Sequence, residues 1–384
     1  MKSFLFRLYL SLMKFCARFV KINATKIVVL NGSGRSGSNG YLFAKYLKNA
    51  HPEYTVTLVE PWPSAHLSWQ TWYEIGAAKF VLTTHQPFKV HKRQVNLQFW
   101  HGIPLKRMGL AAYNTQAKDN QRNARLWLKT TDVVCSSSDL YETLMSACIP
   151  ISAPKYQQLG FPRWDVLQQA AVSKQQILQD LFNQHDEQAE LGIYVPTFRE
   201  ELADEQLIEA IKNGNFLGLS DFDAAKLNDS LKKRHQYLII KLHPYEMQLV
   251  EQLTSSYSNL ALLKNDYLFA NDIDLYELLG ATDFLMTDFS SIYFDYLHLD
   301  RPIIFLTNYL LQYEKVRGLL IGPYQQVVPG PCVNNQMELI QSLQQLPQNH
   351  ENYESSRQYW LALTNQVDSS NYCEDIFNYL TSNF

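Results

Sequence analysis

The chain is 384 residues long, which is more than one compact core usually holds and enough for two domains of ordinary size. Hydrophobic residues make up 46% and charged residues 18%, a composition that excludes a largely disordered chain. The five cysteines are odd in number, widely scattered and without a Cys-x-x-Cys pair. This excludes a disulfide framework or a zinc module and indicates a reducing compartment.

Positive charge is concentrated near the N-terminal end. The first 52 residues contain nine Lys and Arg and no acidic residue, whereas the rest contains 25 basic and 37 acidic residues. A body with that acidic excess is not built to coat nucleic acid, so we expect no nucleic-acid partner. The local positive charge predicts a local anionic partner instead.

Residues 1–23 combine apolar residues with regularly spaced cations. At about 100° per residue, Arg7, Lys14, Arg18 and Lys21 fall on one arc of a helix, and apolar residues cover much of the rest: Phe4, Leu5, Leu8, Leu12, Phe15, Phe19 and Ile22. This predicts a basic amphipathic helix in the headgroup layer of an anionic membrane surface, and so a peripheral membrane protein. Packing of the helix on the protein's own core is the alternative. The segment is too short and too charged to span a bilayer, and Lys14 interrupts it as a secretory signal.

Short apolar runs alternate with helical stretches through the rest of the chain. We expect parallel strands joined by helical crossovers, in an α/β fold with one doubly wound sheet in each half. The first series of strands is expected at residues 26–30, 55–59, 80–83, 95–99 and 133–135. The second is expected at residues 192–195, 237–242, 260–263, 284–287 and 303–306.

A polar, Gln-rich stretch marks the expected join between the two halves. It consists of a predicted helix over 174–184 and the polar run 185–190. The predicted domains are therefore residues 24–188 and 189–346, followed by closing helices over 347–384.

A glycine loop follows the first predicted strand. Gly32-Ser-Gly34-Arg-Ser-Gly37 is a GxGxxG pattern, and Glu60 ends the next strand, as in the dinucleotide fingerprint. Gly-rich turns also occur wherever a strand must turn tightly into a helix near a ligand, and nothing later supplies a hydride-transfer apparatus. We favour a turn that shapes an acceptor or phosphate pocket over NAD binding, with a purely structural turn as the other alternative.

Four polar clusters follow predicted strands, at the edge where open α/β sheets bind ligands. The first contains His101, Gly102, Pro104 and Lys106. A His on a Gly-Pro turn is exposed and rigidly held, which suits a general base near neutral pH, and the cations that follow suit a phosphate. A structural loop His is the alternative.

The second and third clusters carry cations. Thr197 and Arg199 follow the strand at 192–195, and an Arg there can hold phosphate oxygens in a bidentate fork, with a salt bridge as the alternative. Lys241 and His243, two residues apart, point to the same face of a strand end. That pair could neutralise a pyrophosphate or protonate a leaving group.

The fourth cluster contains Asp288, Ser290, Ser291 and Asp295. The two Ser residues fall where a helix is expected to begin, so their hydroxyls and the free backbone N–H groups would form an anion site. A plain N-cap is the alternative for Ser290. Together the four clusters are cationic and hydroxylic, and they predict a site for a phosphorylated nucleotide.

The ordered set resembles the CDP-glycerol glycerophosphotransferase family of teichoic-acid and capsule primases and polymerases. That family's WHGTPLK-like turn, PTFR-like and KLHP strand ends and TDYSS-helix-FD segment are matched by residues 100–106, 196–199, 241–244 and 287–295. Residues 160–165, which include Arg163, look like the family's GYPRND segment, and residues 317–318 and 329–331 look like its RG and GP signals.

Some residues depart from the family pattern. Ile103 replaces Thr, Phe289 replaces Tyr and Trp164 replaces Asn. No Arg occurs in residues 368–377, where the family has one, which puts the contribution of the C-terminal helices in question.

The resemblance implies two Rossmann-like domains facing a cleft, as in the B-type glycosyltransferase fold, with the acceptor on the first and the CDP-alditol mainly on the second. It implies transfer of glycerol phosphate or ribitol phosphate from CDP-glycerol or CDP-ribitol to a hydroxyl of a lipid-linked acceptor, with release of CMP. The product would be a teichoic acid, a capsule or another surface polymer, made at the cytoplasmic face of the cell membrane.

Our mechanistic hypothesis makes His101 the general base that deprotonates the acceptor hydroxyl. Arg199, Lys241, His243 and the helix start at Ser290 would meet the charge on the transferred phosphoryl and leaving groups. Asp295 would orient the ribose or alditol hydroxyls. The expected substrate-binding set is Gly102, Pro104, Lys106, Arg163, Thr197, Arg199, Lys241, Asp288, Ser290, Ser291 and Asp295.

We expect no required cofactor and no catalytic metal, because no clustered carboxylates demand one. Asp272-Ile-Asp274 is a DxD sequence, but it fits a helix start better. A sugar-nucleotide glycosyltransferase of the same fold and a non-catalytic membrane adaptor stay open as other functions. Glycerol or ribitol, and single addition or polymerisation, stay open as well.

Overall fold

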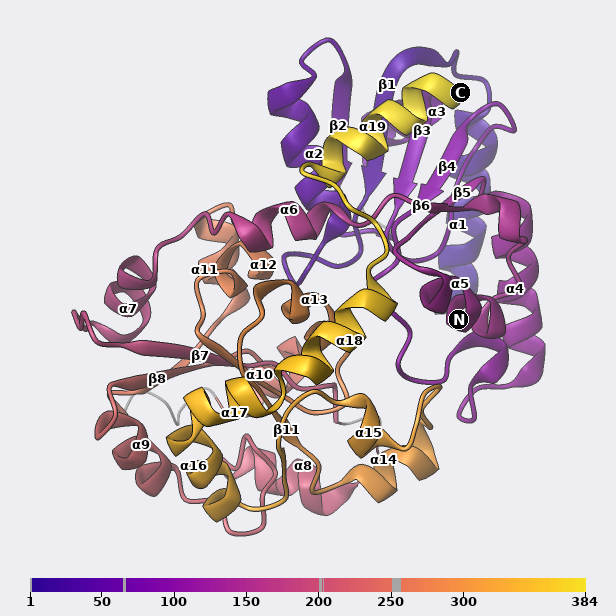
Figure 1. Cartoon of the computed structure of the whole chain (residues 1–384). Coiled ribbons are helices and arrows are strands. Elements are labelled where there is room, and N and C mark those ends of the chain that lie inside the picture. The colour runs from indigo at the N-terminus through magenta and orange to yellow at the C-terminus, as the bar shows by residue number, and fades with distance from the viewer. Residues whose placement is uncertain (1, 65–66, 200–201, 203, 251–256) are drawn as a thin grey trace. The chain divides into compact units, whose positions relative to one another are not determined.

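The computed structural model describes residues 2–64, 67–199, 202, 204–250 and 257–384, which form two compact units. Unit 1 comprises Met1–Gly102, Gln116–Asp165 and Asn365–Phe384, and unit 2 comprises Ile103–Thr115 and Val166–Thr364. Among the described residues, each unit carries a six-stranded parallel sheet with helices around it (Figure 1). The prediction of two Rossmann-like α/β domains is confirmed.

The sheet of unit 1 has the order β2-β1-β3-β4-β5-β6. Its strands are β1 (Asn23–Leu30), β2 (Thr55–Val59), β3 (Ala78–Thr83), β4 (Val95–Gln98), β5 (Val133–Ser136) and β6 (Tyr156–Gln158). Its helices are α1 (Lys2–Ala17), α2 (Asn39–Ala50), α3 (Trp69–Ala77), α4 (Ala117–Thr130), α5 (Asp139–Cys148) and α19 (Tyr372–Asn383), and α6 (Pro162–Gln168) crosses into unit 2.

The sheet of unit 2 has the order β12-β11-β10-β7-β8-β9, so the chain reverses direction across the sheet between β7 and β10. Its strands are β7 (Glu190–Tyr194), β8 (Gln236–Ile240), β9 (Leu260–Leu262), β10 (Phe284–Thr287), β11 (Ile303–Leu306) and β12 (Cys332–Val333). This is the strand order in which ligands bind outside the carboxyl ends of the central strands.

The helices of unit 2 are distributed along the connections between these strands. They are α7 (Lys174–Phe182), α8 (Glu205–Lys212), α9 (Ala224–Lys232), α10 (Pro244–Val250), α11 (Asn265–Ala270), α12 (Leu275–Leu279), α13 (Ile292–Tyr296), α14 (Leu310–Val316), α15 (Tyr324–Val327), α16 (Gln336–Gln344), α17 (Leu346–Asn352) and α18 (Glu354–Thr364).

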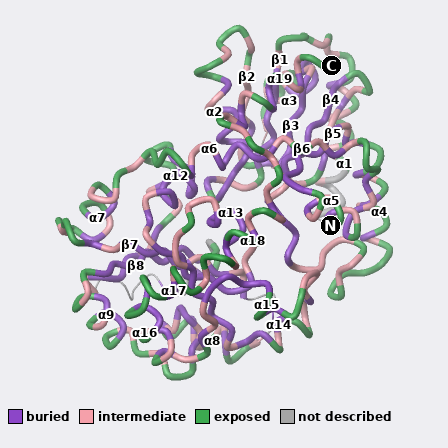
Figure 2. The backbone as a smooth tube through the Cα atoms, in the orientation of Figure 1, coloured by how far each residue is buried: buried purple, intermediate pink, exposed green. Residues whose placement is uncertain are grey.

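The central strands are buried because helices cover both faces of each sheet. β4, β5, β8, β10 and β11 are buried at every residue (Figure 2). Apart from β4, where apolar and polar residues alternate, these strands are nearly continuous apolar runs, which is why they could be predicted from the sequence. β6 and β12 were not predicted, because Tyr156–Gln158 is short and mostly polar and Cys332–Val333 has only two residues.

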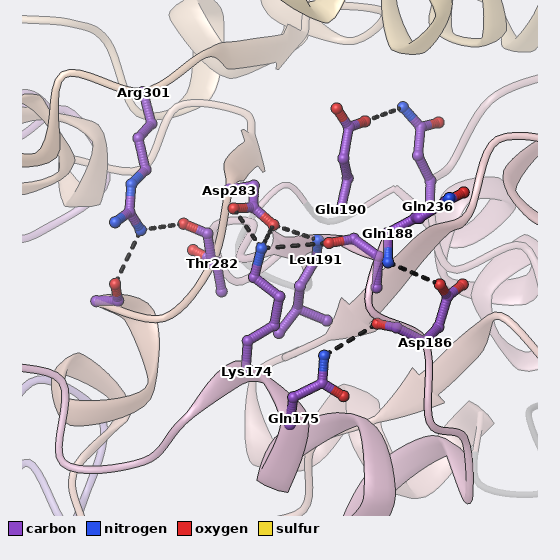
Figure 3. Close-up of polar contacts among 12 residues, drawn as sticks. Lys174, Gln175, Asp186, Gln188, Glu190, Leu191, Gln236, Thr282, Asp283 and Arg301 are labelled. Carbon is purple, nitrogen blue, oxygen red and sulfur yellow. Dashed lines mark hydrogen bonds and ion pairs between the residues drawn. The ribbon is translucent and has the colours of Figure 1, made fainter.

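The division between the units falls at Asp165 and Val166, earlier than the predicted join after residue 188. The helix expected at that join, α7, belongs to unit 2 because its first residue is tied to the sheet. Lys174 forms an ion pair with Asp283 at 2.6 Å, and the Asp283 carboxylate also accepts a hydrogen bond from the Leu191 N–H at 2.7 Å (Figure 3). The polar, Gln-rich stretch that we expected at the join is therefore a helix held to the sheet of unit 2 by an ion pair.

The C-terminal helix returns to unit 1, whereas α17 and α18 remain with unit 2. In Figure 1 the yellow α19 lies beside α2, and Glu374 of α19 accepts a hydrogen bond from the Tyr46 hydroxyl and contacts His51 at 2.9 Å. The start of α19 packs on the segment 160–165. The Asp165 carboxylate accepts hydrogen bonds from the backbone N–H groups of Tyr372 and Cys373 at 2.8 and 2.9 Å.

The N-terminal helix α1 has two different faces. Ala17 is fully buried, and Tyr9, Leu10 and Met13 pack against the core around Trp72. One face thus packs on the protein's own core, as the alternative interpretation expects. On another face Leu8, Leu12, Phe15 and Phe19 are exposed, so the membrane prediction now concerns this face. The side chains of Phe4, Leu5 and Arg7 lie outside the described residues.

No helix in the part of the chain that the structure describes is long and apolar enough to cross a membrane.

We predict that Asp165→Ala loosens α19, because two backbone donors at the start of that helix lose their acceptor. Loss of such a cap costs about 1–2 kcal/mol of the free energy of unfolding. Amide hydrogen exchange should show faster exchange in residues 372–383 than in the wild type. Asp165→Asn, which keeps one acceptor oxygen, serves as the control and should lose less protection, and equal protection in Asp165→Ala and wild type would contradict the prediction.

Candidate functional site

Three of the four predicted clusters meet in unit 2, at the carboxyl ends of the neighbouring strands β10, β7 and β8. The ring of Phe198, after β7, lies 4.0 Å from the ring of His243, after β8. The backbone N–H of Thr197 donates to the Asp288 carboxylate, after β10, at 2.7 Å. The parallel register therefore brings together residues that lie about 90 positions apart along the chain.

Asp288 is fully buried and holds these loops together from within. Its carboxylate accepts hydrogen bonds from the Thr197 N–H at 2.7 Å, the Thr197 hydroxyl at 2.9 Å and the Tyr309 hydroxyl. Burial raises the pKa of Asp288, and the hydrogen bonds from Tyr309 and Thr197 oppose that rise. With its oxygens so occupied, Asp288 positions the β7 and β10 loops rather than facing a ligand.

Arg199 is also internal, which changes the role expected of it. Neither Arg199 nor Glu246 of α10 has exposed side-chain surface, and they form an ion pair at 3.0 Å. The Arg199 guanidinium also donates to the Phe216 carbonyl at 2.6 Å, and its backbone N–H donates to Glu246 at 2.8 Å. In this structure the Arg199 guanidinium binds the Glu246 carboxylate instead of a phosphate. Arg199 is therefore a positioning residue that joins the loop after β7 to α10.

Around the buried contacts of Asp288 and Arg199, the groups that remain accessible to solvent are one His and several hydroxyls. His243 is exposed, and Thr197, Ser290 and Ser291 are half-buried. Ser291 is the N-cap residue of α13, but its side chain makes no capping hydrogen bond, and α13 is only five residues long. The predicted anion site would therefore depend on the hydroxyls and the backbone N–H groups at the start of α13 more than on the dipole of so short a helix.

Lys241 and Asp295 lie deeper, each 4% exposed. The Lys241 ammonium donates to the Asn265 side-chain oxygen at 2.9 Å, and Asp295 accepts from the Tyr276 hydroxyl at 2.8 Å. Burial lowers the pKa of Lys241 to about 8, with the charge of Asp274 opposing the shift. Lys241 is thus a cation at neutral pH that can lose its proton in mildly alkaline solution.

His101 lies in unit 1, on the loop that follows β4, and is half-buried. Its ring is 4.2 Å from that of His85, which follows β3, and 4.4 Å from that of Trp100. Burial lowers the pKa of His85 to about 4, so this ring is neutral at physiological pH. The His85 ring therefore places no positive charge beside His101.

Arg163 holds the His101 loop in place. Its guanidinium donates to the His101 carbonyl oxygen at 2.7 Å, and its side chain is 3% exposed. Gly102 has φ +111°, and a Cβ there would lie 2.2 Å from the Arg163 Nη2. Only glycine leaves room for the guanidinium. Arg163 and Gly102, expected to bind substrate, are placed where they fix the candidate base.

Residues 103–115 belong to unit 2, so the WHGTPLK-like turn passes from one unit to the other between Gly102 and Ile103. Pro104 is buried and Lys106 is half-buried. The following backbone pairs with the RG segment: the Arg107 N–H donates to the Gly318 carbonyl at 3.1 Å, and the Leu320 N–H to the Leu105 carbonyl at 2.8 Å. Two motifs that resemble the family therefore support each other structurally.

In the glycine loop, the groups that would bind a dinucleotide contact other residues of the protein. Glu60, which would hold a ribose in a dinucleotide site, forms an ion pair with Arg35 at 2.8 Å and accepts from the Asn31 amide at 2.8 Å. Asn31 also donates to the Gly34 carbonyl at 3.0 Å. These contacts support a turn closed on itself and weaken the dinucleotide interpretation.

The DxD sequence begins a helix, as expected. Asp274 is the N-cap of α12 and forms a capping box with Glu277. Within the described residues, no group of three or more His, Cys, Asp or Glu side chains is arranged to hold a metal ion.

Sequence reasoning missed Glu246, Tyr309 and His85. Glu246 looks like an ordinary acidic residue in the first turn of α10, and Tyr309 is one of 23 tyrosines. His85 follows a predicted strand just as His101 does, and that position is the signal that could have drawn attention to it.

Comparisons with known proteins point to one family. The family model for CDP-Glycerol:Poly(glycerophosphate) glycerophosphotransferase matches residues 12–382. A teichoic acid glycerol-phosphate transferase of Staphylococcus aureus is 27% identical over 78% of this chain and 76% of its own length. A teichoic acid glycerol-phosphate primase of Bacillus spizizenii is 28% identical over 78% of this chain and 74% of its own.

Solved structures show the same fold. The wall teichoic acid polymerase TagF superposes with a TM-score of 0.79 and 19% identity, covering 97% of this chain and 92% of that one. The Methanocaldococcus jannaschii UDP-GlcNAc 2-epimerase has a TM-score of 0.50 at 11% identity. The family match over nearly the whole chain shows that this protein is an enzyme of the CDP-glycerol:poly(glycerophosphate) glycerophosphotransferase family.

Proposed function

We propose that the chain transfers glycerol phosphate or ribitol phosphate from a CDP-alditol to a hydroxyl of a lipid-linked acceptor at the cytoplasmic face of the cell membrane, releasing CMP. The observation that carries the proposal is the convergence of accessible His243, Thr197, Ser290 and Ser291 at the carboxyl ends of three neighbouring strands, with Lys241 beneath them. The relatives support the donor class, since they include glycerol-phosphate and ribitol-phosphate primases.

In the proposed reaction the acceptor hydroxyl attacks the β-phosphorus of the donor in line. His101 takes the hydroxyl proton, a new P–O bond forms to the acceptor, and the P–O bond to CMP breaks. Positive charge on Lys241 and hydrogen bonds from His243, Ser290 and Ser291 stabilise the transferred and leaving phosphates. Asp295, held by Tyr276, would orient ribose or alditol hydroxyls.

The residues that hold this machinery are distinct from those that touch substrate. Arg199 with Glu246 and Asp288 with Tyr309 fix the loops of unit 2, and Arg163 fixes the His101 loop of unit 1. This division predicts different kinetic behaviour for the two groups. Replacing a residue that contacts substrate should lower kcat or raise the donor KM with the fold intact. Replacing a residue that only positions the loops should also lower the stability of the fold.

We predict that His101→Ala lowers CMP release from CDP-glycerol by roughly 10²–10⁴-fold, the usual contribution of a positioned general base. The assay measures CMP with a membrane lipid extract as acceptor source, and CDP-ribitol is run in parallel. His185→Ala is the control, because His185 is exposed and far along the chain from the clusters. Near wild-type turnover in His101→Ala would remove this residue as the base, and turnover with a UDP- or GDP-sugar instead would favour a glycosyltransferase.

We predict that Gly102→Ala impairs turnover, because its Cβ would displace the guanidinium that holds the His101 carbonyl. We expect kcat to fall by at least about tenfold, since misplacing a catalytic group by about an ångström is costly. Gly34→Ala is the matched control: Gly34 has φ +59°, but nothing lies within 4 Å of its added Cβ. Equal kcat values for the two variants would contradict a role of this close approach.

We predict an alkaline limb in the donor kcat/KM that belongs to Lys241. Because its pKa is lowered to about 8, Lys241 is charged below that pH and neutral above it, so binding of an anionic donor weakens as pH rises through 8. The expected decline approaches tenfold per pH unit. Lys241→Met should lower kcat/KM and remove this limb, while Lys241→Arg should move it to higher pH, and an unchanged profile in both would exclude Lys241 from donor binding.

A further inference from the structure

A pocket of about 840 Å³ lies in unit 2, next to the candidate site. It is lined by parts of residues 204–220 after β7, by residues 307–312 after β11, and by Gln325, Cys332 and Asn334 around β12. In the sheet, β11 and β12 directly follow β10, and neighbouring strands are about 5 Å apart. The pocket therefore adjoins the strand ends that carry the candidate site.

The charge of this pocket disfavours a phosphate. Of its 17 described lining residues none is Lys, Arg or His, and one, Asp204, carries a carboxylate. Asp204 is the N-cap of α8, and its carboxylate accepts hydrogen bonds from the backbone N–H groups of Gln206 and Leu207, both at 3.0 Å. A pocket with a carboxylate and no cation repels anions, so it fits neither a nucleoside diphosphate nor a chain of alditol phosphates.

Side-chain amides make up much of the lining. Six of the 17 residues are Asn or Gln, namely Asn215, Asn308, Asn334, Gln206, Gln312 and Gln325, and Ser220 and Thr307 add hydroxyls. An amide presents N–H donors and a carbonyl acceptor side by side, and the hydroxyl of a ligand likewise donates and accepts. A lining of this kind is complementary to a neutral ligand that carries several hydroxyls.

Several of these amides keep hydrogen-bonding capacity for a ligand. The side chains of Gln206, Gln312 and Gln325 make no hydrogen bond within the part of the chain that the structure describes. The Asn308 amide donates to the Gly218 carbonyl at 2.8 Å, but its own oxygen is buried and has no donor among the described residues. A buried acceptor without a donor costs free energy, and a hydroxyl donor from a ligand would offset that cost.

The wall of the pocket is held in shape by the protein itself. The Asn215 side chain donates to the Leu219 carbonyl at 2.7 Å and accepts from the Gly218 N–H at 2.8 Å, which closes the loop between α8 and α9. Apolar surface completes the lining, since Leu207 is buried and Leu311 is 84% exposed. The C–H groups of a saccharide ring or a polyol chain can pack on Leu311 while the hydroxyls meet the amides.

Tyr309 belongs both to the pocket and to the framework of the candidate site. It lines the pocket, and its hydroxyl donates to Asp288, the carboxylate that also holds Thr197. In Figure 1 the pocket region is found where α8, α14 and α15 lie close together. A ligand that rests against Tyr309 is therefore one side chain away from the carboxylate that positions the loops after β7 and β10.

We infer that this pocket binds a neutral polyhydroxyl ligand, a saccharide or a polyol, beside the donor site of unit 2. Its source is either the uncharged part of the acceptor or a free saccharide, and both present the same chemistry to the pocket. The inference rests on the proposed function only for the position of the donor site. Ligand binding tests it without turnover.

The test is saturation-transfer difference NMR of the full chain with small probes that differ in charge. Methyl glucoside and xylitol are neutral, glucosamine is a cation and glucose 6-phosphate is an anion. Wild type should bind the two neutral probes with a Kd in the millimolar range. Q206A/Q312A should raise that Kd about tenfold, because two amide hydrogen bonds are lost. S220W should abolish binding, because Ser220 is exposed at the pocket and an indole there fills it.

Matched variants control for loss of amides and for added bulk elsewhere in unit 2. Q341A/Q344A removes two exposed glutamines of α16, and S355W adds an indole at an exposed position of α18. Both should bind the neutral probes as wild type does, and all variants should melt at the wild-type temperature.

CMP release from CDP-glycerol with a lipid extract as acceptor then separates the two sources of the ligand. A raised acceptor KM in Q206A/Q312A, with the donor KM unchanged, assigns the pocket to the acceptor. An unchanged acceptor KM, with probe binding weakened, assigns it to a free saccharide. Failure of the proposed function would appear as no CMP release from any of the proteins, with binding of the neutral probes intact.

Three results would overturn the inference. Equal Kd values for the neutral probes in Q206A/Q312A and Q341A/Q344A would exclude the pocket. No binding of either neutral probe to wild type at tens of millimolar would exclude a polyhydroxyl ligand. Binding of glucosamine or glucose 6-phosphate that S220W abolishes and S355W retains, without binding of the neutral probes, would show a site for a charged ligand instead.

Discussion

The buried ion pair between Arg199 and Glu246 is the interaction on which the strand-end loops of unit 2 depend. Both side chains are withdrawn from water, and such a pair is tolerated only when its remaining hydrogen-bonding groups are also satisfied. The Phe216 carbonyl and the Arg199 backbone N–H meet that need. Removal of one partner would leave an uncompensated buried charge, at a cost of about 3–5 kcal/mol. Together with Asp288, this ion pair connects the loops that follow β7, β8 and β10. His243 and the hydroxyls of Thr197, Ser290 and Ser291 lie on these loops.

Much of the fold could be predicted because buried parallel strands are short apolar runs with polar ends. The strands β1 to β5 and β7 to β11 were located to within a few residues, and their carboxyl ends identified the region of the site. The direction in which a side chain of the site points could not be predicted. The motif that contains Arg199 predicts a position near the donor. Whether its guanidinium faces a phosphate or Glu246 depends on a partner 47 residues away, which has no distinguishing mark in the sequence.

The N-terminal helix shows the same limit in another form. Helical periodicity indicates that α1 is amphipathic. Because apolar residues lie on more than one side of the helix, the sequence does not say which of them are buried in the protein core. The structure assigns Tyr9, Leu10, Met13 and Ala17 to the core and leaves Leu8, Leu12, Phe15 and Phe19 outside. The core interpretation is thus confirmed for one face of the helix, and the membrane interpretation stays a prediction for the exposed face.

The candidate base depends on a chain of contacts that begins at the C-terminus. The start of α19 is held by Asp165, two residues beyond Arg163 in α6, and Arg163 in turn holds the carbonyl of His101. The missing Arg in residues 368–377 made the contribution of this helix doubtful, yet its backbone N–H groups suffice because a carboxylate accepts two of them. A helix at the far end of the chain can thus help to position the loop of the candidate base. It does so through hydrogen bonds to main-chain atoms, which place few demands on side-chain identity.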